Sequence, residues 1–433
     1  MVDNASILHD LQTYRPDHVT DFPEHFIWPQ YQGLCVGNLG ATIASILGAS
    51  LPNGLPPLSI PAVADMAHGV KQVILLVMDG LGWLQLARYM HHHPDSLYHR
   101  IADQGILLPL TSGFLSTTNS VLSMIWTGVP PVQHGLLAYE LYLREWMMAV
   151  EAISFGTPHI PFSATLADWG FVPESFLPVP SMAQVLSVQG VLTYQLTAKQ
   201  YVRSHLSRMH NRGVREVHSY NSGSDFWLNL RRMLAHCKQE KALIGGYWSL
   251  VDTLAHTYGP LDETGDMEIR ALELLLDQVF LTPMPVADRE GTLVMIIADH
   301  GQITTPEQAA VLLPEHPDLA NALMMPPVGE ARVPFFYPRS GQFETVWQYL
   351  HEHFAGDFFF LTREQVLEYG LLGPGDMFPE VEYRLGDIIG IAKGDKYFLR
   401  DTALAKKLRG KHGGMSPEEM LVPLMAFRLD AIK

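Results

Sequence analysis

The chain has 433 residues, of which 47% are hydrophobic, 17% charged and 10% aromatic. This composition excludes disordered, collagen-like and low-complexity proteins and predicts a globular protein with a packed core. Its 29 basic and 45 acidic side chains give a net charge of −16, the wrong sign for non-specific attraction to long polyanions, so we expect no bulk binding of nucleic acid.

Cysteine usage and the hydrophobic segments indicate the compartment. The only two cysteines, Cys35 and Cys237, lack CxxC spacing, so neither a disulfide framework nor a cysteine zinc site is predicted. The N-terminus shows no basic region followed by an apolar stretch, and the apolar runs are far shorter than the roughly 20 residues of a membrane span. We therefore expect a cytoplasmic protein without a membrane association.

The predicted elements begin after an N-terminal segment, 1–70, that is Pro-rich in places and has a helical start at 38–43 but no predicted chemical role. Short unbroken apolar runs are typical of buried parallel strands. Three such runs occur, at 73–78, 242–248 and 293–298. Helices are expected to begin at 116–119 and to span 225–238 and 266–280.

This alternation of strands and helices predicts an α/β fold with a mostly parallel central sheet and helices on both faces. From about 338 to 410 the sequence changes, with an aromatic cluster at 358–360, Gly-rich turns and short β-like runs such as 387–391. We interpret 338–410 as a smaller inserted α+β region or cap. The catalytic core then comprises 1–337 and 411–433, with the role of 1–70 open.

Acidic residues follow all three predicted strands, which would bring them together because ligands bind at the carboxyl ends of strands in open α/β sheets. Three imidazoles beside three carboxylates are typical of a transition-metal site rather than a calcium or magnesium site. Six such side chains suffice for two ions with positions left for substrate. The candidate ligands are Asp79, Asp252, His256, Asp299, His300 and His412.

Each candidate ligand also has a structural interpretation. An Asp after a strand is commonly a cap or turn residue, and His412 alone would be an ordinary loop histidine. The joint occurrence of all six after these strands favours the metal site. The tract at 91–93 is interpreted as a solvated helix end, and Cys237 as a small buried side chain in a helix.

A candidate nucleophile lies in the hydroxyl-rich segment 116–121, before an apolar helix. Ser and Thr commonly cap helices, and the same helix N-terminus attracts a phosphoryl group through its free N–H groups. A hydroxyl bound there to a metal ion would be activated as a nucleophile. The two interpretations are compatible.

With these residues in place, the sequence resembles the alkaline phosphatase superfamily, and within it the type I phosphodiesterase/nucleotide pyrophosphatase family, over about 70–330 and 410–427. That family has a nucleophilic Thr nine residues before a Thr-Gly and sixteen before a His-Gly, which points to Thr118 and not Thr117. The other matching motifs are Asp79-Gly80, Asp252-x-x-x-His256 with Gly259-Pro260, Asp299-His300-Gly301 and His412-Gly413.

The resemblance implies how two ions would be held. Asp252, His256 and His412 would bind one ion, and Asp79, Thr118, Asp299 and His300 the other. Zinc is the family expectation, with manganese or iron as alternatives because these ligands do not select strongly among the three metals.

One position departs from the family pattern. Many nucleotide pyrophosphatases carry an Asn about twenty-one residues after the nucleophile that binds a phosphoryl oxygen, whereas this chain has Tyr139 there. Tyr139 or Asn119 are the candidate replacement donors. The departure leaves the identity of the substrate open without affecting the metal ligands.

The resemblance implies a two-metal hydrolase that cleaves phosphodiester or pyrophosphate bonds through a phosphothreonine intermediate. A phosphomonoesterase or phosphonate hydrolase on the same scaffold is the alternative. A sulfatase is disfavoured because this chain has no Cys/Ser-x-Pro-x-Arg motif, and a mutase because that subfamily is expected to use Ser as its nucleophile. A non-catalytic metal-stabilised binding protein would be expected to have lost a metal ligand or the nucleophile, and none is missing here. We expect a small phosphate-ester substrate, nucleotides included, and leave the leaving group and the oligomeric state open.

Overall fold

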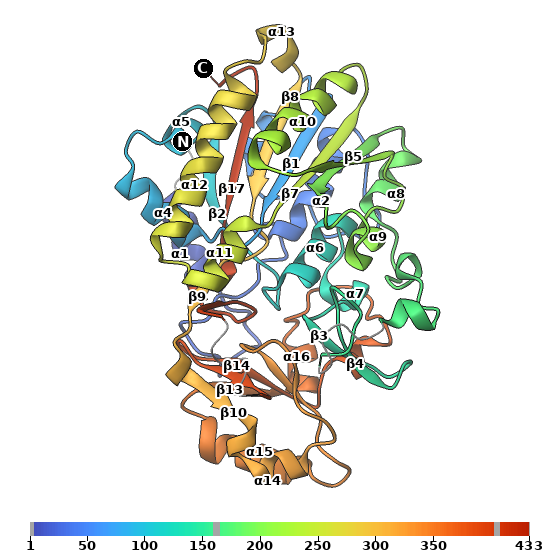
Figure 1. The fold of residues 1–433 in the computed structure, drawn as a ribbon, viewed down its shortest axis with the longest axis vertical. Coiled ribbons are helices and arrows are strands. Elements are labelled where there is room, and N and C mark those ends of the chain that lie inside the picture. The colour runs from blue at the N-terminus through green and yellow to red at the C-terminus, as the bar shows by residue number, and fades with distance from the viewer. Residues whose placement is uncertain (1–3, 159–164, 402–407, 433) are drawn as a thin grey trace.

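A seven-stranded sheet forms the centre of the computed structural model, which describes residues 4–158, 165–401 and 408–432 (Figure 1). β17 runs antiparallel to both of its neighbours, and the other pairings are parallel. The expected mostly parallel sheet is therefore confirmed. The strands lie in the order β2 (Ile106–Thr111), β17 (Leu421–Arg428), β8 (Thr292–Ile297), β1 (Gln72–Met78), β7 (Ala242–Trp248), β5 (Leu192–Ala198) and β6 (Glu216–Tyr220).

Helices cover both faces of this sheet, and two glycines of β7 show why. Successive strand residues face opposite sides of a sheet. A Cβ on Gly245 would lie 2.6 Å from Trp126 of α6 (Thr118–Thr127), and one on Gly246 would lie 3.2 Å from Phe226 of α10 (Gly223–His236). The absence of both side chains thus lets helices approach from either side, and every residue of β1 and β8 is buried.

The predicted strands and helices match the observed elements closely. The runs at 73–78, 242–248 and 293–298 are β1, β7 and β8. The segment 225–238 is α10, and 266–280 is α12 (Glu263–Leu275) with a following π-helical turn, Leu276–Leu281. In the N-terminal segment, the helical start at 38–43 becomes α2 (Leu39–Ile46), and α1 (Asn4–Thr13) lies against β2.

A second sheet, antiparallel throughout, lies beyond the carboxyl ends of the central strands; we call it the cap sheet. It takes β13 and β14 from the predicted insert and its other strands from 140–151 and 328–336. The division into core and insert at 338–410 stays a prediction. The strand order is β13 (Phe358–Thr362), β14 (Ile388–Ala392), β12 (Pro334–Phe336), β11 (Val328–Gly329), β3 (Glu140–Leu143) and β4 (Met148–Glu151).

Three smaller expectations concern single residues and segments. His91 and His92 are exposed at the end of α4 (Trp83–His92), as expected for a solvated helix end. Cys35 and Cys237 are buried free thiols. None of the helices within the described ranges is both long and apolar enough to cross a bilayer.

A buried ion pair joins the cap sheet to the core. The Arg332 guanidinium donates to Glu419 from Nε at 3.0 Å and from Nη2 at 2.8 Å, and both side chains are 0% exposed. Glu419 also accepts from the backbone N–H of Gly414 at 2.9 Å and of Ser416 at 3.3 Å, which holds the loop that follows His412. Although burial alone would raise the pKa of Glu419, Arg332 and these N–H groups hold that pKa below its usual value.

We predict that Glu419→Gln lowers the free energy of unfolding by about 3–5 kcal/mol, because it leaves the Arg332 charge buried without its partner. Urea unfolding of the two proteins measures the difference. Glu418→Gln, one residue earlier, is the matched control and should change the value by less than about 0.5 kcal/mol. Equal stabilities for Glu419→Gln and the native protein would contradict the prediction.

Candidate active site

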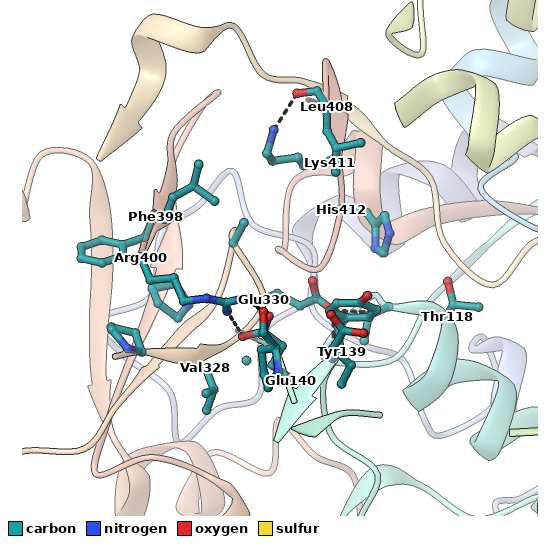
Figure 2. A pocket seen from close by; sticks show the side chains of 18 of the residues that line it. Thr118, Tyr139, Glu140, Val328, Glu330, Phe398, Arg400, Leu408, Lys411 and His412 are labelled. Carbon is teal, nitrogen blue, oxygen red and sulfur yellow. Dashed lines mark hydrogen bonds and ion pairs between the residues drawn. The ribbon is translucent and has the colours of Figure 1, made fainter. Parts of the chain in front are cut away.

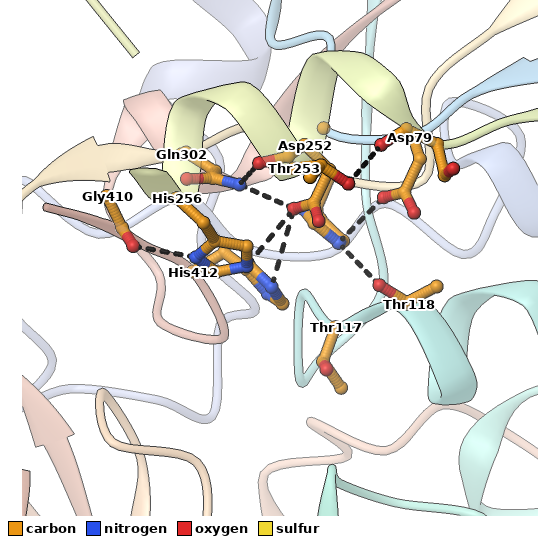
Figure 3. Close-up of polar contacts among 12 residues, drawn as sticks. Asp79, Thr117, Thr118, Asp252, Thr253, His256, Gln302, Gly410 and His412 are labelled. Carbon is orange, nitrogen blue, oxygen red and sulfur yellow. Dashed lines mark hydrogen bonds and ion pairs between the residues drawn. The ribbon is translucent and has the colours of Figure 1, made fainter. Parts of the chain in front are cut away.

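Three carboxylates meet at the carboxyl ends of three neighbouring strands, and Figure 3 labels two of them, Asp79 and Asp252. Asp79 directly follows β1, Asp299 follows β8, and Asp252 lies in the first turn of α11 (Leu250–Tyr258) after β7. Because β1 pairs in parallel with both β7 and β8, the three strand ends lie side by side. Backbone contacts fix the arrangement: Asp252 N–H donates to Asp79 O at 3.0 Å, and Gly80 N–H donates to Asp299 Oδ1 at 3.2 Å.

The three imidazoles share one hydrogen-bonding pattern. Each has its Nδ1 within hydrogen-bond distance of a backbone carbonyl, which assigns the proton to Nδ1 and leaves Nε2 as the free ligand atom. The carbonyl partners are Gly410 O at 2.8 Å from His256, Ser116 O at 3.0 Å from His412 and Gly301 O at 3.1 Å from His300.

All three Nε2 atoms point toward the carboxylates. His256 Nε2 lies 3.3 Å and His412 Nε2 3.8 Å from Asp252 Oδ1. His300 Nε2 lies 3.5 Å from Asp79 Oδ1 and 3.7 Å from Asp299 Oδ2. The structure thus brings together all six side chains that the sequence nominated as ligands.

This cluster fits divalent cations. Two sets of ligand atoms each lie within 4.8 Å of one another: Asp79, Asp299 and His300, and Asp252, His300 and His412. In the part of the chain that the structure describes, the buried Asp79 Oδ1 and Asp299 Oδ2 have no hydrogen-bond partner. A bound cation would satisfy both oxygens.

The electrostatics of the cluster agree with this fit. Burial, followed by the nearby Asp299 and Asp252 carboxylates, raises the pKa of Asp79 well above its usual value. Burial and the neighbouring His300 and His256 rings lower the pKa of His412 well below its usual value, which keeps the imidazole in its neutral, ligating form. Positive charge between these groups would relieve the repulsion among the carboxylates.

Two side chains that the sequence analysis did not nominate hold the ligands in place. The Tyr247 hydroxyl donates to Asp79 Oδ2, and Gln302 Nε2 donates to both Oδ1 and the backbone carbonyl of Asp252. Such contacts orient ligating carboxylates. Tyr247 lies near the end of β7 and Gln302 just after His300, so their positions at strand ends were the only sequence signal.

Thr118 and Thr117 point to different partners. Thr118 begins α6, and its Oγ1 lies 3.1 Å from His300 Nε2. Thr117 Oγ1 instead lies 2.5 Å from Glu330 Oε1 and 3.3 Å from Asn119 Oδ1. Only the Thr118 hydroxyl therefore faces the ligand cluster.

The two candidate phosphoryl donors occupy different environments. Asn119 is buried, and its side-chain amide donates to Ala138 O at 2.6 Å. Tyr139 lies in a cavity wall, and its backbone N–H donates to Glu330 Oε1 at 3.1 Å. Glu330, which no sequence motif indicated, thus contacts both Tyr139 and the residue before Thr118.

The ligand cluster lies where two cavities meet. The larger cavity, of about 530 Å³, lies between core and cap sheet, and Figure 2 shows its wall. The smaller, of about 240 Å³, includes Asp79, Tyr247 and Thr197 in its lining. Thr118 and Asp252 line both cavities. A group bound at Thr118 can therefore extend in two directions.

Comparisons with known proteins agree with this architecture. The sequence matches the family described as type I phosphodiesterase / nucleotide pyrophosphatase over residues 73–415. A comparison with curated proteins finds no match.

Several solved structures share the fold. Murine ectonucleotide pyrophosphatase / phosphodiesterase 5 is similar at 16% identity and a TM-score of 0.60, covering 82% of this chain and 87% of that chain. The inactive form of that protein in complex with AMP has 15% identity and a TM-score of 0.59, over 82% and 88%. Phosphonoacetate hydrolase from Sinorhizobium meliloti 1021 in complex with phosphonoformate has 17% identity and a TM-score of 0.59, over 83% and 93%.

We predict that Asp79→Asn abolishes most of the stabilisation that comes from a zinc ion at Asp79, Asp299 and His300. For each occupied site of the native protein, zinc at 100 times its dissociation constant should add about 2.7 kcal/mol to the free energy of unfolding. The metal-free variant should be at least as stable as the metal-free native protein, because one of three repelling carboxylates is gone. Urea unfolding with zinc or EDTA measures both effects, with Asp376→Asn at an exposed position as control; undiminished zinc stabilisation in Asp79→Asn would contradict the prediction.

Proposed function

The chain belongs to the type I phosphodiesterase/nucleotide pyrophosphatase family of the alkaline phosphatase superfamily, and we propose that it is a two-metal hydrolase of phosphodiester or pyrophosphate bonds. Membership of this family supports phosphoester hydrolysis. The observation that carries the finer proposal is the Thr118 hydroxyl, 3.1 Å from His300 Nε2, at the junction of two cavities.

Two divalent ions would be held by the ligand cluster. Asp252, His256 and His412 would bind one, and Asp79, Asp299, His300 and the Thr118 hydroxyl the other. Zinc is the expected ion, and manganese or iron also suits this donor set. When bound, such ions lower the pKa of a coordinated hydroxyl and offset the charge on phosphoryl oxygens.

The chain's own residues then account for the reaction. The Thr118 hydroxyl gives its proton to solvent, and its Oγ1 attacks phosphorus. The bond from phosphorus to the leaving oxygen breaks with its electron pair, and the leaving oxygen takes a proton from water. The product on the protein is a phosphothreonine. Water next attacks the same phosphorus, the bond from phosphorus to Thr118 Oγ1 breaks, and the hydroxyl is restored. The free N–H groups at the start of α6 stabilise the phosphoryl oxygens throughout.

The two cavities favour a substrate with two substituents on phosphorus. A phosphodiester or pyrophosphate can place one substituent in each cavity, whereas a monoester would leave one of them without a ligand group. A small phosphate ester, nucleotides included, suits the larger cavity of about 530 Å³. The AMP and phosphonoformate in the complexes of similar folds support a small phosphorus oxyanion as ligand. A phosphomonoesterase or phosphonate hydrolase would use the same ligand cluster and is distinguished by assay.

The first test replaces the proposed nucleophile. Thr118→Ala should lower turnover of bis-p-nitrophenyl phosphate by roughly four orders of magnitude or more, because no atom remains to form the covalent intermediate. Zinc content, measured by mass spectrometry of the metal, should stay close to that of the native protein. Thr118→Ser, which keeps a hydroxyl, is the control and should retain measurable turnover. Full activity of Thr118→Ala would exclude the proposed nucleophile.

A second test concerns the smaller cavity. Thr197→Phe places an aromatic ring in its lining, and kcat/KM for bis-p-nitrophenyl phosphate should fall at least about tenfold while that for p-nitrophenyl phosphate changes little. Thr197→Ser, which leaves the cavity open, serves as control. Equal losses on both substrates, or a native preference for the monoester, would point to the phosphomonoesterase instead.

A further inference from the structure

Glu330 extends from the cap sheet into the larger cavity. It directly follows β11, and a tight turn holds its backbone: Glu330 N–H donates to Val333 O and Val333 N–H donates to Glu330 O, both at 3.0 Å. Its side chain lines the same cavity as Thr118 and His412, and Figure 2 shows it in that wall. A residue of the cap sheet thus reaches the reaction centre of the core.

The Glu330 side chain is fixed from three sides. Oε1 accepts from Thr117 Oγ1 at 2.5 Å and from Tyr139 N–H at 3.1 Å. The aliphatic part packs against Gly413, where an added Cβ would lie 2.7 Å from Glu330 Cγ. No hydrogen bond from the described residues reaches Oε2, so Oε2 is the atom available to a ligand in the cavity.

The charges around Glu330 favour its neutral form. Two arginines in this region are already engaged, Arg332 two residues after Glu330 with Glu419, and Arg400 of the same cavity wall with Glu140. Burial first, and the charges of Glu140 and Glu419 to a smaller extent, raise the pKa of Glu330 to about 8, against the lowering effect of its hydrogen bonds. An anionic phosphate in the cavity would disfavour the carboxylate further.

The bound ions would not reverse this preference. Four positive charges from two divalent ions would be balanced by the carboxylates of Asp79, Asp252 and Asp299 and by the ionised Thr118 oxygen. The substrate's own anionic oxygens would then be the net charge that faces Glu330. A neutral acid that donates a hydrogen bond is the form that this environment selects.

We propose that Glu330, as a neutral carboxylic acid, is a substrate-binding residue whose Oε2 donates a hydrogen bond to a non-bridging oxygen of the phosphoryl group. The inference rests on the proposed function and adds a residue to it. Two other donors beside the cavity are already engaged, because the Asn119 amide donates to Ala138 O and the Tyr139 backbone N–H donates to Glu330 itself. Glu330 also specifies the ligand class, since a neutral donor suits an anionic phosphate ester.

The test compares Glu330→Ala and Glu330→Gln in the zinc-loaded protein. Loss of a hydrogen bond to a charged oxygen should lower kcat/KM for bis-p-nitrophenyl phosphate about 10- to 100-fold in Glu330→Ala. Calorimetry should show a similar loss in affinity for inorganic phosphate. Glu330→Gln keeps both an acceptor for Thr117 and a donor for phosphate. Its kcat/KM and its affinity for phosphate should therefore lie within about threefold of the native values. Glu382→Ala, at an exposed position of the cap, is the control for charge removal.

The pH profile provides an independent readout. The donor is present below the pKa of Glu330 and lost above it, so kcat/KM of the native protein should fall as pH rises through about 8. Glu330→Gln cannot ionise and should lack this decline. The other titratable and charged groups on the elements packed around Glu330 and its cavity include Tyr139, Glu140, Glu151, Arg332, Arg400, Lys411, His412 and Glu419. These groups are common to both proteins, so the difference between the two profiles isolates Glu330.

Three outcomes would overturn the inference. If Glu330→Ala hydrolyses the diester and binds phosphate like the native protein, Glu330 does not bind substrate, and the proposed function stands. If Glu330→Gln loses as much activity as Glu330→Ala, although both variants have the same unfolding temperature as the native protein, the site requires a carboxylate and not a neutral donor. If the native zinc-loaded protein neither hydrolyses the diester nor binds phosphate, the proposed function fails together with this inference.

Discussion

Repulsion among three carboxylates, two of them buried and the third half-buried, is the constraint around which this protein is organised. Asp79, Asp252 and Asp299 lie together because β1, β7 and β8 are adjacent parallel strands whose carboxyl ends meet. Two of their oxygens, Asp79 Oδ1 and Asp299 Oδ2, are buried without a hydrogen-bond partner in the described part of the chain. Compensating positive charge would stabilise such a cluster, and three imidazoles with their Nε2 atoms turned inward complete a site for it.

The cap sheet contributes to this centre through one short turn. Glu330 reaches the residue before Thr118, while Arg332, two residues later, forms the buried pair with Glu419 that holds the loop after His412. The two side chains have opposite environments: Arg332 has a full carboxylate partner, whereas Glu330 has only N–H and O–H donors. The environment of Arg332 suits a structural ion pair, and that of Glu330 suits a neutral acid that contacts an anionic ligand. The position of the cap relative to the core is thereby tied to the geometry of the reaction centre.

The strands and the clustering of the six candidate side chains could be predicted because both follow from local patterns. Buried parallel strands read as unbroken apolar runs, and the acids directly after them meet through the sheet topology. Thr118 was separated from Thr117 by motif spacing, and their hydroxyls indeed face different partners. Tyr247, Gln302 and Glu330 were missed because their partners lie 168, 50 and 213 residues away and no local pattern encodes those contacts. The cap strands at 140–151 were missed for the same reason, since they join strands from 328–392 only in three dimensions.

The most direct test of the metal centre is anomalous X-ray scattering at the zinc edge from crystals grown with zinc. We predict two peaks, one contacted by Asp79, Asp299 and His300 and the other by Asp252, His256 and His412, with the Thr118 hydroxyl beside the first. Peaks only at surface histidines such as His91 and His92, with none among the six ligands, would contradict the account.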